Sequence, residues 1–307
     1  MNGDCQSLDS IIRQAAGQLA VAEIEEPLHE ARLIMEDACQ IKIVQQLSQA
    51  DRSLSENDIA IFFDLIEQRK QGIPFAYLQG KASFYGREFL VNHCLIPRPE
   101  TELILDLVLT EAANFTDESC RFLDLCTGSG CLALSIYLEL KEDFECRALL
   151  TELSDQALQT CKKNIEKYKA EQRLYALKAD LFPSKTQLEK IKNKDSSWQQ
   201  FTFDLIVANP PYVKSQDIAD LDKSVKQYEP HLALDGGTDG LDFYRRIAKE
   251  IKPFIKKNKS TLILEHGADQ SADIIEIFEK SDLQILDQIQ KNDLQGHDRI
   301  LVFSLKV

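Results

Sequence analysis

The fold is decided by seven consecutive residues near the middle of the chain, Asp124-Leu125-Cys126-Thr127-Gly128-Ser129-Gly130. They end a short apolar run, residues 121–125, and precede a second apolar stretch, residues 131–138, that suits a helix. Glycines let such a loop turn sharply and let a ligand approach main-chain N–H groups at a helix N-terminus. Strand, glycine loop and helix in this order indicate the first unit of a nucleotide-binding α/β sheet.

Strand-like and helical patterns alternate from this loop onward. Strands are expected at 121–125, 147–151, 174–179, 203–208 and 261–264, and helices at 131–138, 155–165, 242–251 and 274–279. This alternation favours a doubly wound α/β sheet. Two final strands, 283–289 and 299–305, have only a polar turn between them and should pair antiparallel at one edge. The Lys-rich segment 185–200 is expected to be a surface loop.

The chain before this sheet has a different pattern. Apolar residues recur at helical spacing in 11–19 and 28–38, and Ser55 suits the N-cap of a third helix. Residues 81–97 mix aromatic and apolar side chains with Gly86 and Asn92, which indicates a β-hairpin. We therefore expect a helical bundle at 1–78, a hairpin linker at 79–97 and the α/β domain at 98–307.

Composition narrows the class of protein. The chain has 307 residues and a net charge of −14, which disfavours direct nucleic-acid binding because phosphate contacts need clustered Lys and Arg. Its first residues do not look like a signal peptide and no apolar run approaches the ~18 residues of a membrane span, so a cytoplasmic location is expected. The eight cysteines form no metal-binding pattern, and we expect reduced thiols and no metal site.

Two carboxylates stand at the ends of predicted strands. Glu152 ends the second strand, where it can accept hydrogen bonds from both hydroxyls of a ribose. Asp180 ends the third, within reach of an adenine amino group. Gly128, Gly130 and Ala133 also satisfy the relaxed dinucleotide fingerprint, so an NAD-dependent dehydrogenase stays open at this point.

The tetrapeptide Asn209-Pro210-Pro211-Tyr212 directly follows the fourth predicted strand and indicates the chemistry. Two prolines fix two φ angles and leave stiff, forward-pointing carbonyls. The Asn209 side-chain oxygen and the Pro210 carbonyl can together accept both hydrogens of an –NH2 group, and Tyr212 offers a ring face for a flat substrate. Amides and exocyclic amines are poor nucleophiles that need such positioning before they attack a methyl donor.

These residues resemble the class I S-adenosylmethionine-dependent methyltransferases, and more narrowly the protein-(glutamine-N5) methyltransferases of peptide chain release factors, the HemK/PrmC family. The resemblance covers nearly the whole chain, in segments 77–80, 84–86, 96–102, 124–130, 209–212, 229–241 and 264–267. Segments 96–102 and 229–241 are the specific ones, because Asn-Pro-Pro-Tyr alone is shared with adenine-N6 and guanine-N2 enzymes of DNA and RNA.

The resemblance implies a Rossmann-like methyltransferase sheet with an antiparallel edge strand, preceded by the helical bundle and hairpin linker. It implies that S-adenosylmethionine, with S-adenosylhomocysteine as product, is bound by Cys126, Thr127, Gly128, Ser129, Gly130, Glu152, Asp180, Leu181 and Asn209. The glutamine of a release factor's Gly-Gly-Gln loop is then held by Asn209, Pro210, Pro211 and Tyr212, of which Asn209, Pro210 and Tyr212 are catalytic. Cys126 and Glu152 stand where the family often has Gly and Asp.

Other substrates and functions stay open from sequence. A ribosomal-protein glutamine or a nucleic-acid adenine or guanine is the alternative methyl acceptor, and a dehydrogenase or a non-catalytic adaptor could use the same fold. Arg98, Glu100 and Glu102 could shape the substrate entrance or be surface charges before a helix. Phe84 and Tyr85 are expected in the hairpin core, and His266 is expected to be structural.

Overall fold

The computed structural model describes residues 7–113, 118–293 and 295–307, so Cys5 lies outside the described residues. The chain divides into two compact units. The first comprises residues 1–80 and 223–228, and the second comprises residues 81–222 and 229–307. Each unit is described by itself below.

The first unit is helical. Its elements are α1 (Leu8–Val21), α2 (Pro27–Cys39), α3 (Ile43–Ser48), α4 (Glu56–Lys70), α5 (Phe75–Gln79) and α10 (Lys223–Tyr228). Ser7 and Ser55 cap α1 and α4 by accepting hydrogen bonds from backbone N–H groups of the first turn. Ile11, Ile34 and Phe62 are fully buried where three of the helices meet, so the expected bundle has a core of its own.

The second unit is built on a seven-stranded sheet. The strands are β3 (Ser119–Leu125), β4 (Glu145–Glu152), β5 (Leu174–Lys178), β6 (Leu205–Ala208), β7 (Ser260–Glu265), β8 (Gln284–Asn292) and β9 (Asp298–Lys306). Their order is β5-β4-β3-β6-β7-β9-β8. The first five are parallel, and β9 is antiparallel to both β7 and β8. The predicted α/β sheet with an antiparallel edge is confirmed, and the outermost strand is β8.

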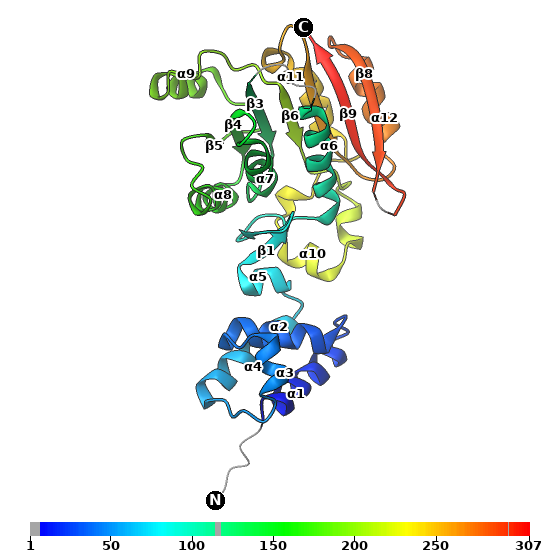
Figure 1. The fold of residues 1–307 in the computed structure, drawn as a ribbon. Helices are drawn as coiled ribbons and strands as arrows, with labels where there is room; N and C mark the ends of the chain where they lie inside the picture. The colour runs from blue at the N-terminus through cyan, green and yellow to red at the C-terminus, as the bar shows by residue number, and fades with distance from the viewer. Residues whose placement is uncertain (1–6, 114–117, 294) are drawn as a thin grey trace, which may run out of the picture. The chain divides into compact units, whose positions relative to one another are not determined.

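Helices cover both faces of this sheet (Figure 1). They are α6 (Glu102–Ala112), α7 (Cys131–Leu140), α8 (Asp155–Lys167), α9 (Lys185–Lys194), α11 (Asp242–Glu250) and α12 (Ser271–Glu279), with short 3₁₀ turns η1 (Pro99–Thr101), η2 (Asp217–Asp220), η3 (His231–Ala233) and η4 (Lys252–Phe254). A two-stranded hairpin, β1 (Lys81–Phe84) and β2 (Arg87–Leu90), precedes them, as predicted. Phe84 lies in its core, and Tyr85 is partly buried against the same cluster.

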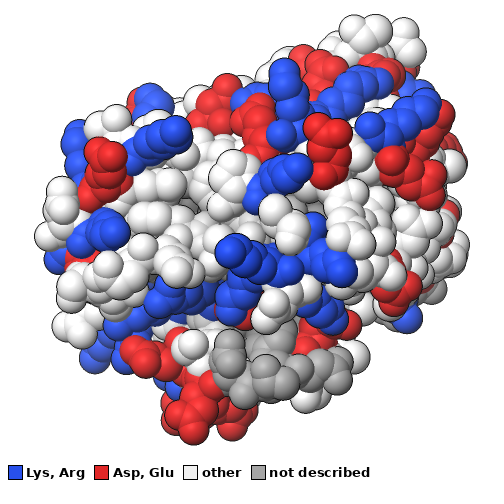
Figure 2. Space-filling view, turned by 90° about the horizontal axis from the view of Figure 1, so that it is seen from above, with Lys and Arg blue, Asp and Glu red and all other residues white. Residues whose placement is uncertain are grey.

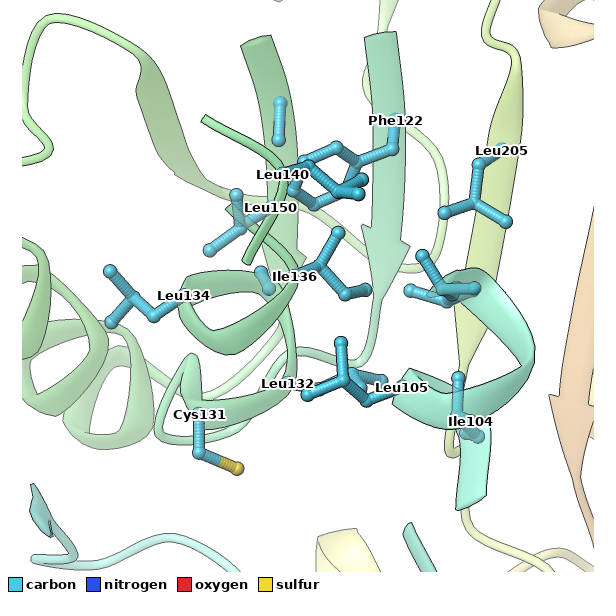
Figure 3. Close-up of a cluster of buried hydrophobic side chains, with 14 of the residues drawn as sticks. Ile104, Leu105, Phe122, Cys131, Leu132, Leu134, Ile136, Leu140, Leu150 and Leu205 are labelled. Carbon is cyan, nitrogen blue, oxygen red and sulfur yellow. The ribbon is translucent and has the colours of Figure 1, made fainter. Parts of the chain in front are cut away.

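The core consists of two layers, one on each face of the sheet. Figure 3 shows the first layer, to which α6 contributes Leu105, α7 contributes Ile136 and β3 contributes Phe122. Leu123, the next residue of β3, points to the opposite face and joins the second layer under α11 and α12. Burial on both faces explains why β6 and the centre of β7 are continuously apolar in sequence.

The expectation of a surface loop at 185–200 is wrong. Residues Lys185–Lys194 form α9, which starts with a capping box in which Ser184 and Gln187 exchange hydrogen bonds. Leu188 packs against the second core layer, and Trp198 is completely buried beyond the helix. The sequence does not predict this helix because most of its residues are polar, and only a narrow apolar stripe of it contacts the core.

The surface carries both signs of charge. The view in Figure 2 shows a band of Lys and Arg side chains bordered by Asp and Glu, so neither sign covers this face alone. Among the described residues, no helix is long and apolar enough to cross a membrane. No disulfide joins the cysteines in the part of the chain that the structure describes.

Candidate active site

A cavity opens at the carboxyl ends of the parallel strands, where ligands bind in open α/β sheets. Several predicted site residues line it together: Cys126, Gly128, Glu152, Asp180, Leu181, Asn209 and Pro211. Its apolar wall adds residues that sequence reasoning did not select, among them Leu153, Leu232 and Phe243. The cavity therefore combines fixed polar groups with an apolar surface suited to a nucleoside.

Three residues of the predicted loop lie behind the cavity wall. The Thr127 hydroxyl donates a hydrogen bond to Asp124, and the Ser129 carbonyl accepts one from Asn164. Gly130 caps α7 with φ of +78°, and a Cβ there would lie 2.7 Å from Cys161 Sγ. Thr127, Ser129 and Gly130 thus shape the loop, while Cys126 and Gly128 face the cavity.

Glu152 ties the end of β4 to the glycine loop. One carboxylate oxygen accepts a hydrogen bond from the Gly128 N–H at 2.9 Å, and the other accepts one from the Ser154 N–H at 2.8 Å. Burial raises the pKa of Glu152, while these backbone hydrogen bonds lower it. Each oxygen keeps a lone pair for a further donor, so the carboxylate can still accept ribose hydroxyls from the cavity.

The loop backbone accommodates a ligand. Gly128 has φ of +55°, and a Cβ at this position would point into open space beside the cavity, so a ligand can approach the bare main chain. Cys126 has φ of +57°, the left-handed region that favours glycine. The loop therefore holds Cys126 in a conformation that a glycine adopts at less cost.

The end of β5 supplies the far side of the cavity. Asp180 forms an ion pair with Arg246 of α11 at 2.8 Å, and it remains about half exposed. Leu181, next to it, is 3% exposed. The adenine amino group predicted to meet Asp180 would share the carboxylate with Arg246.

Asn209 sits where β6 ends, at the edge of the same cavity. Its side-chain Nδ2 donates a hydrogen bond to Thr101 Oγ1 at 3.0 Å, and Thr101 donates to the buried Glu265 at 2.6 Å. These contacts use the Nδ2 end of the Asn209 amide, so its Oδ1 is the end directed away from Thr101. Sequence reasoning selected Asn209 but not its two partners.

The proline loop after Asn209 is clamped by residues 234–240. The Val213 N–H donates to the Leu234 carbonyl at 2.9 Å, and the Gly236 N–H donates to the Val213 carbonyl at 2.8 Å. A Cβ on Gly236 would lie 2.8 Å from the Pro211 carbonyl oxygen. The specific segment 229–241 therefore serves as a brace, and only a glycine allows so close an approach.

Tyr212 lies on the other side of this loop. Its carbonyl accepts a hydrogen bond from Gln270 Nε2 at 2.9 Å, and its side chain lines a second, open depression with Asp239 and Lys280. Burial raises the pKa of the Tyr212 phenol. Pro210 is buried and lines neither depression.

Arg98 forms an ion pair within the domain and is not simply a surface charge. Its guanidinium contacts Glu229 at 2.6 Å, and the second Glu229 oxygen accepts the Ile96 N–H at 3.2 Å. The Glu229 side chain is 2% exposed, and the residues after it, Pro230 and Leu232, line the cavity. The ion pair therefore joins the two sequence segments that carry the narrow resemblance. Glu102 instead accepts the Tyr85 N–H at 2.6 Å in the hairpin turn.

His266 is fully buried beside Glu265. Its Nδ1 contacts the Gly267 carbonyl at 2.8 Å, while burial lowers its pKa. It does not line the cavity, and this position supports the predicted structural role.

Two family models match the chain. Residues 10–80 match the PrmC N-terminal domain, and residues 83–234 match the family described as Conserved hypothetical protein 95.

Curated relatives match nearly the full chain. The release factor glutamine methyltransferase of Agrobacterium fabrum is 32% identical over 94% of this chain and 94% of its own length. That of Bacillus subtilis is 32% identical over 94% of this chain and 95% of its own. The Bifunctional methyltransferase of Rickettsia typhi is 34% identical over 97% of this chain, which spans only 57% of that longer protein.

Solved structures agree on the fold. The hMettl16 catalytic domain, solved with MAT2A 3′UTR hairpin 1, superposes with a TM-score of 0.52 at 14% identity, over 88% of this chain and 90% of that chain. A likeness at so low an identity concerns the fold alone.

Proposed function

Because the chain belongs to the family of release factor glutamine methyltransferases, we propose that it methylates the glutamine side-chain amide of the Gly-Gly-Gln motif in translation release factors. The methyl donor in this proposal is S-adenosylmethionine and the product is S-adenosylhomocysteine. The proposed activity implies a cytoplasmic enzyme, because its substrate works with the ribosome, and it requires no direct nucleic-acid contact.

The cavity at the strand ends suits the donor. Glu152 offers a fixed carboxylate for the ribose hydroxyls, and Gly128 leaves bare backbone beside it. Leu153, Leu181 and Phe243 supply apolar contacts for the base. S-adenosylmethionine supplies an electrophilic methyl group on a sulfonium when it is bound.

The single observation that carries the proposal is the orientation of Asn209. Its Nδ2 is bound to Thr101, so its Oδ1 remains an acceptor at the cavity edge, one residue before the Pro210 carbonyl. We propose that these two oxygens accept the two hydrogens of the glutamine amide and aim its nitrogen at the donor methyl. Two fixed acceptors discriminate an –NH2 group from a hydroxyl or a methyl group, since neither of those offers two donors.

An amide nitrogen is a poor nucleophile because its lone pair is delocalised into the carbonyl. Two acceptors that draw the hydrogens out of the amide plane localise that lone pair on nitrogen and so favour attack. We propose that Tyr212 holds the end of the proline loop in place, because its carbonyl accepts a hydrogen bond from Gln270 Nε2. The nitrogen becomes acidic only once it carries the methyl group, so proton loss follows transfer and needs no strong base.

The helical residues 1–78 are proposed to recognise the release factor, with 79–97 as linker to a methyltransferase domain at 98–307. This assignment is supported by the match of residues 10–80 to a family model named for the PrmC N-terminal domain. Methylation of a ribosomal-protein glutamine or of a nucleic-acid base is not favoured, because the relatives with full-length matches are named for release factors.

The experiment is to incubate the purified chain with methyl-labelled S-adenosylmethionine and a purified bacterial release factor. Label should enter the release factor, and a variant release factor with Gln replaced by Ala in the Gly-Gly-Gln motif should stay unlabelled. Equal labelling of that variant, or a release factor that stays unlabelled, would reject the proposed substrate.

A further inference from the structure

Three side chains from three separate segments form a hydrogen-bonded series beside the cavity. Thr101 ends η1, Asn209 follows β6 and Glu265 ends β7. Asn209 Nδ2 donates to Thr101 Oγ1 at 3.0 Å, and Thr101 Oγ1 donates to Glu265 Oε2 at 2.6 Å. Thr101 is 5% exposed and Glu265 is 1% exposed, so water does not compete for these hydrogen bonds.

The order of donors and acceptors in this series follows from Glu265. An ionised carboxylate can only accept hydrogen bonds, so the Thr101 hydroxyl must donate its one hydrogen to Glu265. Thr101 Oγ1 then has only lone pairs to offer, and the Asn209 group that faces it must be the –NH2 rather than the carbonyl. The opposite end of the same amide, Oδ1, is thereby directed away from Thr101.

Protonation of Glu265 would remove this constraint. A neutral carboxyl can donate to Thr101, and the Thr101 hydroxyl can then turn its hydrogen toward Asn209. The Asn209 amide could accept that hydrogen through Oδ1 and would turn its –NH2 outward. An –NH2 group cannot accept the hydrogens of a substrate amide.

The groups around Glu265 bring its pKa near neutral pH, so the Asn209 amide would turn in that pH range. Burial is the largest cause that raises the pKa of Glu265, Glu100 of η1 adds to it, and the resulting pKa is about 7. The hydrogen bonds from Thr101 and Asn209 and the charge of Arg299 on β9 lower it. Two phenols are also close: Tyr244 donates to the Glu265 backbone carbonyl at 2.8 Å, and burial raises the pKa of both Tyr244 and Tyr212.

We propose that Glu265, acting together with Thr101, is a positioning residue that holds the Asn209 amide with its Oδ1 toward the methyl-accepting nitrogen. The inference rests on the proposed function and assigns a purpose to two residues that do not line the donor cavity. It also explains why segment 96–102 accompanies the Asn-Pro-Pro-Tyr site, since Thr101 accepts a hydrogen bond from Asn209 and donates one to Glu265.

The test compares Thr101→Val with Thr101→Ser. Valine keeps the shape of threonine and removes the hydroxyl, whereas serine keeps the hydroxyl. We expect Thr101→Val to lower kcat for release factor methylation by roughly tenfold to hundredfold, the cost of one misdirected hydrogen bond in the transition state. Thr101→Ser should keep most of the parent's kcat. Both variants should bind S-adenosylhomocysteine within about threefold of the parent, because the donor cavity does not include Thr101.

A pH profile separates positioning from mere packing. In the parent protein kcat should rise with pH through an inflection near 7, because only ionised Glu265 directs the amide. Glu265→Gln has no charge to lose, so its kcat should be low and lack that inflection. A Thr101→Val rate equal to the parent's, or an unchanged inflection in Glu265→Gln, would overturn the inference. A parent protein that transfers no methyl group to the release factor would instead overturn the proposed function.

A measurement on the unmodified chain needs no activity. With ¹⁵N-labelled asparagine, the side-chain –NH2 resonance of Asn209, assigned by its loss in Asn209→Ala, should shift with pH in one step near 7. A resonance that shows no such step would overturn the link between Glu265 and Asn209 even if every variant failed to fold.

Discussion

Glu152 and Gly128 are joined by a hydrogen bond of 2.9 Å from the Gly128 N–H to a Glu152 carboxylate oxygen. The bond connects the end of β4 to the loop after β3, so the carboxylate and the bare backbone face the cavity together. Both groups belong to the proposed donor site, and the bond makes the position of each depend on the other.

Glu152→Gln tests this arrangement. The glutamine –NH2 would oppose either the Gly128 or the Ser154 N–H, because both are donors. We expect the Kd for S-adenosylhomocysteine to rise by about tenfold to hundredfold, measured by calorimetry. Glu171→Gln changes the same group at an exposed position and should leave the Kd unchanged. Equal affinity of Glu152→Gln and Glu171→Gln would remove Glu152 from the donor site.

Asn209→Ala tests the acceptor for the substrate amide. The variant loses Oδ1, and we expect the methylation rate at saturating donor to fall by at least about a hundredfold. Affinity for S-adenosylhomocysteine should stay nearly intact, because Glu152 and Gly128 still form the ribose side of the cavity. A variant that keeps its rate would exclude Asn209 from the mechanism.

Gly236→Ala tests the brace on the proline loop. The added Cβ would lie 2.8 Å from both the Pro211 carbonyl oxygen and the Tyr212 Cα, which are backbone atoms that cannot move aside alone. We expect a destabilisation of about 1–3 kcal/mol in the free energy of unfolding and a larger fall in methylation rate than in donor affinity. Both follow if the clash displaces the residues that hold the substrate.

Gly17→Ala is the matched control for that substitution. Gly17 lies inside α1, and an added Cβ meets nothing within 4 Å. Alanine should therefore stabilise the chain by about 0.5–1 kcal/mol, as measured by denaturant unfolding. If Gly17→Ala and Gly236→Ala change stability and rate alike, the brace has no special role.

Asp124 gives stability a dependence on pH. Burial raises its pKa to about 7 in the folded protein, whereas the unfolded value is about 4. The folded chain thus holds this proton more tightly, so the stabilisation is complete below about pH 4 and is lost as the pH rises through about 7. An asparagine at this position does not titrate, so Asp124→Asn does not lose stability in this way. The difference in the free energy of unfolding, variant minus parent, should therefore increase by on the order of 2–3 kcal/mol between about pH 5 and pH 8.

Chemical or thermal unfolding of the two proteins at matched pH measures that difference. The other ionisable groups are common to both proteins and cancel. The Asn amide adds a constant offset, because it bears the same hydrogen-bonding groups at every pH. A difference that stays flat across the range would show that Asp124 does not titrate near neutral pH.

Most strands and helices could be predicted because their apolar residues recur with a regular spacing. Strands such as 121–125 are short runs rich in apolar residues, and the short turn between the last two strands predicts the antiparallel edge pair. Helix α9 was missed because its lysines outnumber the apolar residues that contact the core. Sequence patterns reveal a helix through the periodic spacing of its apolar residues. A helix that buries only a few side chains has too few apolar residues to show this spacing.

The site could be predicted only where chemistry sits in one short segment. Residues 124–130 and 209–212 are contiguous, so their loop and their tetrapeptide were visible. Thr101 precedes Asn209 by 108 residues and Glu265 lies 164 residues after Thr101, so no spacing links them. The Arg98–Glu229 ion pair spans 131 residues in the same way. Such partners emerge only when the topology brings the strand ends together.

The central claim is that the side-chain nitrogen of one glutamine receives the methyl group. The most direct measurement is mass spectrometry of peptides from a release factor incubated with the chain and S-adenosylmethionine, fragmented to locate the added methyl. The account predicts one methyl group on the side chain of the glutamine in the Gly-Gly-Gln peptide, absent when Asn209→Ala replaces the parent. A methyl group on any other residue, or a Gly-Gly-Gln peptide that stays unmodified, would contradict it.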